Sequence, residues 1–194
     1  MESHSLKSCV SQFVRFPETD WQEIESRFRA VHLAKSEFLI QAGAPCRVMA
    51  FIERGFLRMY NLVDGKEITL WIGQGGSFIT SLSSFVFETE NHWTIQAVTD
   101  CELRVISRED HFRLLDQFPK WLAFDNHLLA RSFALLEQSM FAHLHTTALQ
   151  RLNTLMDSHP GIFLHVPHQH IATMIGVTPE TLSRLRRQLA QGTS

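Results

Sequence analysis

The spacing of hydrophobic and polar residues divides the chain into three zones. In residues 17–30, Trp21, Ile24 and Phe28 recur at helical spacing, which predicts a short helix. From about Phe38 to Ser107, short apolar runs are broken by glycines roughly every ten residues, a pattern typical of short antiparallel strands. Helical patterns return after this zone. We therefore expect an α+β fold with an N-terminal antiparallel β-roll of the jelly-roll type, flanked by helices.

One dipeptide marks a hairpin within the strand zone. Asp64-Gly65 separates FLRMYNLV from KEITLWIG. A tight two-residue hairpin turn needs residues that tolerate a positive φ, and Asp-Gly meets that need. The sequence therefore predicts two paired strands joined at Asp64-Gly65.

The third zone begins after Arg108 with a short helix, REDHFRLLDQF, which ends at Pro119. A second run continues to residue 145 without Gly or Pro, and two sets of its residues, each spaced by seven, interleave. This heptad seam consists of Leu122, Asn126, Leu129, Phe133, Leu136 and Met140. Such a pattern fits a dimerisation coiled coil with Asn126 setting the register, but a helix packed on its own domain has nearly the same period. Residues 148–156 predict one more helix before Pro160 and Gly161.

The segment VPHQHIATMIGVTPETLSRLRRQL predicts two helices joined by a tight turn. Pro167 suits the first turn of one helix, and Gly176 provides the left-handed backbone that ends it. Thr178 is a good N-cap for the next helix, whose apolar face is Leu182, Leu185 and Leu189. The small Ala172 lets the two helices cross closely, as a helix-turn-helix requires.

The other face of the second helix carries side chains that suit DNA recognition. Arg184 can donate two hydrogen bonds to guanine, and Glu180, four residues earlier, can accept one from the cytosine amino group. We expect Glu180, Ser183 and Arg184 to contact bases. Contacts to the DNA backbone are expected from Gln169, Thr178, Thr181, Arg186 and Arg187. The alternative is that Glu180 and Arg184 form only a surface ion pair.

Charge agrees with this division of the chain. The net charge of −2 and pI near 6.6 do not by themselves indicate a nucleic-acid binder. Up to Phe141, however, 14 Lys and Arg face 18 Asp and Glu, whereas from Ala142 onward the numbers are 4 and 2, together with six histidines. Positive charge is therefore concentrated in the C-terminal zone.

The cysteines and the start of the chain indicate the compartment. Cys9, Cys46 and Cys101 are far apart and odd in number, which favours a reducing environment over a disulfide framework and does not fit an iron-sulfur cluster. The first ten residues lack the pattern of a signal peptide, and no apolar run has the length of a membrane span. We expect a cytoplasmic protein without a membrane partner.

Together, these residues resemble the Crp/Fnr family of bacterial transcription regulators. The strongest similarity lies in GVTPETLSRLRR, where Glu180, Ser183 and Arg184 match the E-x-x-S-R pattern of the Fnr-like branch. This resemblance implies a homodimer that binds an inverted repeat with TTGA-like half-sites, with RNA polymerase as a further partner. It also implies a sensor β-roll over residues 1–118, a dimerisation helix over 119–145 and a DNA-binding domain over 146–194. The implied dimer favours the coiled-coil reading of the heptad seam.

The departures from the family pattern concern the ligand. GSFITSLSSF and WTIQAVTDCELRVI resemble the phosphate-binding cassette of cyclic-AMP-binding members. Ser81 stands where those members have a glutamate for the ribose, and Asn91 or a neighbour stands where they have an arginine for the phosphate. A buried phosphate without a cation is costly, so we expect no cyclic AMP, no other cofactor and an unknown small-molecule effector, if one exists. The candidate pocket residues are Phe78, Ser81, Leu82, Asn91 and His92.

A further departure lies at the C-terminal end of the sequence. Five residues follow Leu189, fewer than the β-hairpin wing of many family members requires. Either the sequence is truncated here, or this branch of the family works without the wing, in which case we expect DNA affinity to depend more on the recognition helix.

Other functions fit the sequence less well. A cupin-like metal enzyme needs several histidines inside the barrel, but residues 38–107 contain only His92. His165, His168 and His170 are close in sequence, but His168 and His170 would face different ways on a helix, so no metal site is expected. A protein-interaction module that has kept the fold and lost DNA binding is the remaining alternative. We expect a non-enzyme.

Overall fold

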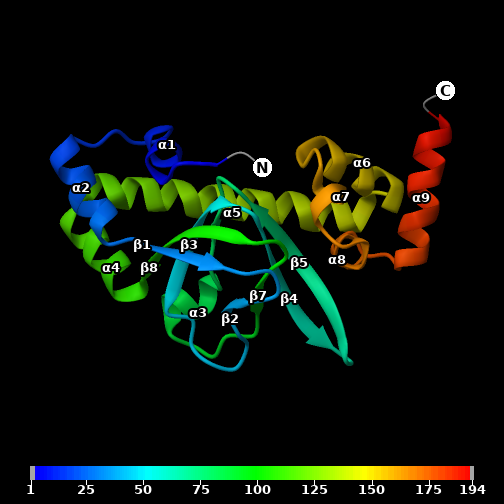
Figure 1. The fold of residues 1–194 in the computed structure, drawn as a ribbon, viewed down its shortest axis with the longest axis horizontal. Helices are drawn as coiled ribbons and strands as arrows, with labels where there is room; N and C mark the ends of the chain where they lie inside the picture. Colours follow the sequence, from blue (N-terminus) through cyan, green and yellow to red (C-terminus); the bar gives the residue numbers. More distant parts are fainter. Residues whose placement is uncertain (1–2, 193–194) are drawn as a thin grey trace.

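The computed structural model describes residues 3–192 as a β-roll followed by helices (Figure 1). The N-terminal part contains α1 (Leu6–Ser11), α2 (Glu18–Ser26), β1 (Arg29–Leu33), β2 (Phe38–Ile40), β3 (Val48–Arg54), β4 (Phe56–Val63), β5 (Lys66–Gln74), β6 (Phe78–Ile79), α3 (Leu82–Phe87), β7 (Thr94–Ala97) and β8 (Cys101–Ser107). The C-terminal part contains α4 (Arg108–Gln117), α5 (Pro119–His145), α6 (Ala148–Ser158), α7 (Ile162–His165), α8 (His168–Met174) and α9 (Pro179–Gly192).

The strands form two four-stranded antiparallel sheets. Their orders are β1-β8-β3-β6 and β2-β7-β4-β5, so strands distant in sequence lie side by side in both sheets. Apolar side chains from β3 and β8, such as Phe51, Ile52 and Leu103, are fully buried in the core of the roll. The predicted β-roll is confirmed.

The sequence patterns predicted some strands of the roll correctly and missed other elements. Asp64 and Gly65 have φ of 50° and 73° and join β4 to β5, so the predicted hairpin is confirmed. The strand zone starts at Arg29 and not at Phe38, because Arg29–Leu33 pairs with β8; the preceding helix therefore ends at Ser26, before Ala30. A short helix, α3, interrupts the zone and was not predicted.

The long helix α5 anchors one end in the roll. Pro119 ends α4 and occupies the first turn of α5, where its missing N–H costs nothing. Trp121 and Phe124 are fully buried and join the core of the roll. The rest of α5 extends along the long axis of the molecule towards the C-terminal helices (Figure 1).

Helices α6 to α9 form a small head at the far end of α5. The capping box of Thr147 and Gln150 starts α6, and the Gly176 turn, with φ of 72°, separates α8 from α9. The unpredicted α7 follows the stop at Pro160 and Gly161. Ile171, Ala172 and Leu182 are buried where α8 and α9 cross, so the predicted helix-turn-helix is confirmed.

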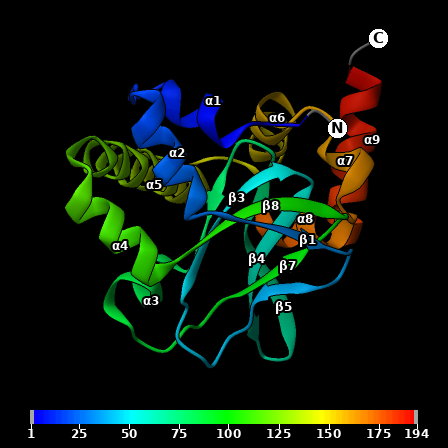
Figure 2. The same cartoon turned by 60° about the vertical axis from the view of Figure 1, so that its left-hand side comes forward.

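The head and the roll share a hydrophobic cluster. Phe56, Ile72 and Val98 of the roll pack with head residues that include Leu152 and Ile171. Figure 2 shows α8 beside the strands of the roll, and the backbone N–H of Thr69 in β5 donates to Thr173 Oγ1 in α8 at 3.3 Å. The head is therefore packed against the β4–β5 hairpin.

Candidate nucleic-acid interface and ligand cavity

The N-terminal end of α9 is fixed by its cap. The hydroxyl of Thr178 accepts the backbone N–H of Thr181 at 3.3 Å, as the N-cap prediction requires, and lies 3.3 Å from Thr181 Oγ1. The buried Leu182 holds the helix on α8, and Leu185 and Leu189 pack along the same side. This anchoring determines which face of α9 points to solvent.

The three expected base-contacting residues lie on that outer face. Glu180, Ser183 and Arg184 are exposed. None of the residues that the structure describes forms an ion pair with Arg184, so the surface ion pair with Glu180 is not present. Hydrogen bonds from its own backbone N–H and from Thr178 lower the pKa of Glu180, which keeps the carboxylate ionised as an acceptor.

The residues expected to contact the DNA backbone have different surroundings. Gln169 and Arg187 are exposed. Thr178 and Thr181 are engaged in the cap of α9. Arg186 lies 4.6 Å from the Phe163 ring and 2.9 Å from His168 Nε2, contacts that tie α9 to α7 and α8. Arg187 is therefore better placed than Arg186 for a phosphate contact.

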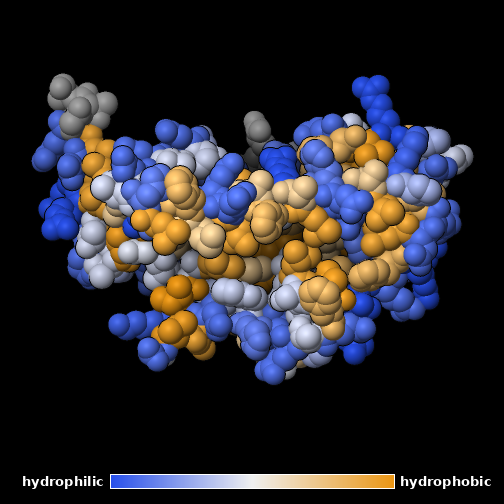
Figure 3. All heavy atoms as spheres, turned by 180° about the vertical axis from the view of Figure 1, so that it is seen from behind, coloured by the Kyte–Doolittle hydropathy of each residue, from blue (hydrophilic) through white to orange (hydrophobic). Residues whose placement is uncertain are grey.

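All six residues of the heptad seam are exposed on α5 in the single chain. Phe133 and Met140 have exposed fractions of 68% and 62%, which is unusual for large apolar side chains. Seen from behind, apolar side chains gather across the middle of the molecule, beside a hollow (Figure 3). A contiguous apolar stripe of this kind is typical of a surface that a partner covers.

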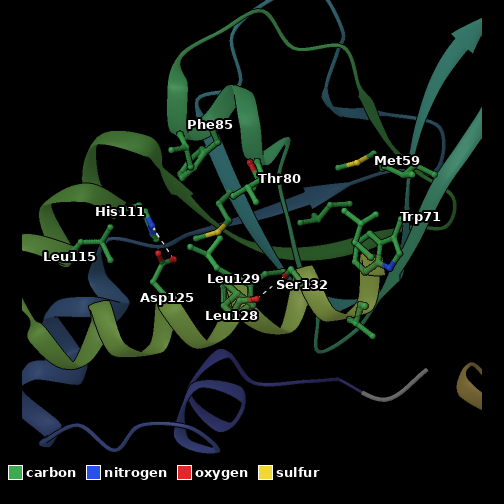
Figure 4. A pocket seen from close by; sticks show the side chains of 18 of the residues that line it. Met59, Trp71, Thr80, Phe85, His111, Leu115, Asp125, Leu128, Leu129 and Ser132 are labelled. Atoms are coloured by element: carbon green, nitrogen blue, oxygen red, sulfur yellow. Dashed lines mark hydrogen bonds and ion pairs between the residues drawn. The ribbon is translucent and has the colours of Figure 1, made fainter. Parts of the chain in front are cut away.

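A cavity of about 410 Å³ lies between α5, α4 and the roll. Figure 4 shows His111 and Asp125 at one side of it and Met59 and Trp71 at the other, with Thr80 and Leu129 between them. Its lining also contains Phe78 and Leu82 from the expected pocket, but not Ser81, Asn91 or His92.

Ser81, Asn91 and His92 do not line the cavity. Asn91 is buried, donates to the carbonyls of Gln41 and Trp93, and accepts the Trp93 N–H at 2.9 Å. These bonds use both ends of the amide, so Asn91 holds the loop before β7. Ser81 is buried with no partner for its hydroxyl among the described residues, and His92 is exposed.

The junction between roll and head contains a buried arginine that sequence reasoning missed. Arg58 of β4, 5% exposed, bonds Gln96 Oε1 at 2.6 Å and pairs with Glu67 at 2.6 Å. Its Nη1 atom also lies 2.7 Å from Nδ1 of His170 in α8, and its guanidinium stacks 4.0 Å from Tyr60. No local motif announces this cluster, because its members come from three strands and a helix.

The pKa of His170, which lies in that junction, is strongly lowered by its surroundings. Burial, and secondly the charge of Arg58, lower its pKa from 6.5 to about 4, against the opposing charge of Glu67. At neutral pH the ring is therefore uncharged and accepts the Arg58 hydrogen bond.

The turn between α8 and α9 is tied to α5 and α6. Arg151 of α6 donates to the carbonyls of Ile175 at 3.0 Å and Thr146 at 2.6 Å. His143 Nε2 of α5 lies 3.3 Å from the carbonyl of Met174. The bonds to Met174 and Ile175 lie at the end of α8, so they fix the turn that leads into α9.

Other candidate groups have simple surroundings. Cys46 and Cys101 are buried, as expected for small core residues, and burial raises the pKa of the Cys101 thiol. Among residues 3–192, no three His, Cys, Asp or Glu side chains gather as a metal site would require. Within the same residues, no helix is long and apolar enough to cross a membrane. At the C-terminal end, where we expected no β-hairpin wing, α9 continues to Gly192. Residues 193–194 lie outside the described part.

Comparison with known proteins identifies the architecture. Residues 30–118 match the family model of the cyclic nucleotide-binding domain. FixK2 from Bradyrhizobium japonicum superposes with a TM-score of 0.74 at 19% identity, covering 86% of each chain. A putative Crp/Fnr regulator from Eubacterium rectale superposes with a TM-score of 0.69 at 20% identity, over 91% of this chain and 85% of that one. The chain has the Crp/Fnr fold.

The Crp/Fnr fold extends over both roll and head, whereas a second similarity covers the roll alone. The inwardly rectifying potassium channel KCNH2 of Sus scrofa is 24% identical over 95 residues, which are 49% of this chain. The same stretch is only 8% of the channel's own length. The resemblance to the Crp/Fnr family predicted from GVTPETLSRLRR is thus confirmed at the level of the whole fold.

Proposed function

We propose that this protein is a transcription regulator of the Crp/Fnr type that binds double-stranded DNA through α9. The observation that carries this proposal is the outer face of α9. Packing on α8 leaves Glu180, Ser183 and Arg184 exposed at the first turns of the second helix of a helix-turn-helix. That is the part of a recognition helix that meets base edges in the major groove.

The chemistry of this face is complementary to a G·C base pair and its neighbours. Arg184 has no internal ion pair among the described residues and is available for guanine O6 and N7. The ionised Glu180 can accept from the cytosine amino group, and Ser183 adds a small donor and acceptor between them. Arg187 adds a phosphate contact on the same helix.

The homodimer follows from the exposed heptad seam. A second copy of α5 would cover Phe133, Leu136 and Met140 and place two heads on one side of the molecule. A two-fold dimer binds an inverted repeat with half-sites about one helical turn apart, roughly 34–36 Å. Such a regulator works in the cytoplasm, with RNA polymerase as its further protein partner and an effector in the roll.

Selection of bound duplexes from a random DNA pool tests the proposal. The purified full chain is used at about 50 mM and again at about 200 mM salt, since non-specific affinity falls steeply over this range. We expect an inverted repeat of TTGA-like half-sites that persists at the higher salt. Enrichment by the wild type that is equal to enrichment by an Arg184→Ala, Glu180→Ala double variant would contradict base recognition by α9.

The alternative of an interaction module without DNA binding gives a different result. In that case no sequence is enriched, with or without a cell extract that supplies small molecules. A repeat recovered only with the extract supports a regulator that requires its effector.

A further inference from the structure

The cavity beneath α3 differs chemically from a cyclic-nucleotide site. We propose that it binds an uncharged and mostly apolar small molecule. The regulatory part of this inference rests on the proposed function, whereas the binding of the ligand does not.

The size and walls of the cavity fit a small apolar ligand. Its volume of about 410 Å³ lies within the range of small-molecule sites, roughly 300–1,000 Å³. Met59, Trp71 and Leu70 line one part, and Phe85, Val86 and Leu128 line another. An apolar space offers water few hydrogen bonds, so an apolar ligand gains by entering it.

The charges around the cavity exclude a phosphorylated ligand. None of the described residues that line it is a lysine or an arginine. Its ionisable groups are His111 and Asp125, which face each other with Nε2 and Oδ1 at 3.3 Å. A phosphate placed here would be buried without a cation and next to a carboxylate, which is strongly unfavourable.

Two of the three hydroxyl groups that line the cavity are already engaged as donors. Thr80 donates to the carbonyl of Val48 at 2.8 Å, and Ser132 donates to the carbonyl of Leu128 at 2.8 Å. An anionic ligand would therefore find two acceptors and no free hydroxyl donor at these places. A neutral apolar ligand needs no hydrogen-bond donor at these places.

The buried imidazole of His111 adds little polarity to the cavity. His111 is 3% exposed and lines the cavity, and its Nδ1 atom has no hydrogen-bond partner among the described residues. Because this atom has almost no accessible surface, it is closed off from the cavity, and the ring offers a ligand no exposed polar atom there.

The position of the cavity links it to the heptad seam. Leu129 and Leu136 line the cavity and are also members of the seam. A ligand that packs against these two leucines changes the surface that α5 offers to a second copy. Occupancy of the cavity and strength of the dimer are therefore coupled.

The first test is calorimetric titration of the full chain, without DNA, with three ten-carbon ligands that differ in their head groups and with cyclic AMP. We expect 1-decanol to bind at least tenfold more tightly than decanoate, and decyl phosphate and cyclic AMP to show no saturable binding. Tighter binding of decyl phosphate or cyclic AMP than of decanol would overturn the inference. The absence of decanol binding would overturn it as well.

Two pairs of variants locate the site. Ser132→Trp fills the cavity from α5 and should weaken decanol binding at least tenfold, whereas Ala130→Trp, on the same helix but outside the lining, should leave it unchanged. Ser132→Arg adds the cation that the cavity lacks and should make decyl phosphate the tighter ligand; Ala130→Arg is its control. Equal effects of both members of a pair would place the ligand elsewhere. Circular dichroism confirms that each variant is folded.

Sedimentation with and without saturating decanol tests the coupling to the dimer. We expect a shift of at least threefold in the dimer dissociation constant, and an unchanged constant would overturn the regulatory part. Decanol binding with no DNA sequence selected would refute the proposed function alone. A selected inverted repeat without decanol binding would refute this inference alone.

Discussion

The recognition face of α9 and the cavity of the roll are opposite kinds of site. The first is polar, exposed and built from one helix, so each side chain is free to meet a partner. The second is apolar, partly open to solvent and built from strands, α3, α4 and α5. The difference shows that two physical requirements are met in one chain. The head keeps polar and charged side chains exposed to solvent, and the roll keeps an apolar cavity unfilled by its own side chains.

The largest expected effect concerns the helix that connects the two sites. Leu129→Asp would place a carboxylate from each copy in the dimer interface, where an unpaired charge costs on the order of 3–5 kcal/mol. We expect monomers in sedimentation at concentrations where the wild type is a dimer. Leu144→Asp is the control, since Leu144 is 78% exposed on the same helix and lies outside the seam. An intact Leu129→Asp dimer would place the interface elsewhere.

The second prediction separates the scaffold of α9 from its outer face. Leu182 is fully buried between α9 and α8, so Leu182→Ala should lower the free energy of unfolding by about 2–5 kcal/mol. Thermal or urea unfolding measures this change. Ser183→Ala, one residue along, should alter stability by less than about 0.5 kcal/mol because its side chain is exposed. Equal losses in both variants would mean that the outer face is also structural.

The third prediction divides the outer face itself. Arg184→Ala should reduce affinity for the selected repeat by about 1–3 kcal/mol and relax the preference at one base pair. Arg187→Ala should weaken binding to all sequences alike and reduce the salt slope by about 1. Fluorescence anisotropy at several salt concentrations distinguishes the two, with Arg131→Ala on α5 as the neutral control. Uniform losses from Arg184→Ala on every sequence would remove its base-contacting role.

The smallest expected effect depends on pH and concerns the junction. The pKa of His170 is about 4 in the folded chain and 6.5 in the unfolded chain, so between these values the unfolded chain binds more protons. The free energy of unfolding should therefore fall as the pH is lowered from about 6.5 to 4. His170→Gln, which keeps an acceptor for Arg58, should flatten this fall, and His92→Gln should not. Unfolding midpoints across this range measure it, and identical profiles for His170→Gln and the wild type would contradict the assignment.

The sequence predicted the head better than the cavity for a physical reason. Helical spacing is local, so the positions of Leu182, Gly176 and Arg184 already determined which side of α9 is buried and which is exposed. The turn at Asp64-Gly65 was predictable on the same ground, because its backbone demand is met within two residues. Such features need no knowledge of the rest of the chain.

The cavity and the junction depend on contacts between distant segments. Phe78 and Leu82 were expected in the pocket and line it, but His111 and Asp125, from α4 and α5, carry no signal that connects them to β6. Asn91 looked like a ligand-binding position and instead bonds three backbone groups of its own loop and a neighbour. Arg58 and His170 are 112 residues apart, so only the folded chain brings them together.

The two anchors of α5 have a mechanical consequence. Trp121 and Phe124 fix its start in the roll, and the His143 contact with Met174 fixes its other end to the turn before α9. A helix of 27 residues is a rod about 40 Å long. A small rotation of this rod about its own axis at the roll reappears as a sideways displacement of the head. In the proposed dimer on DNA, a displacement of about 3.4 Å, the spacing of neighbouring base pairs, would move the two α9 helices out of register with the two halves of the site.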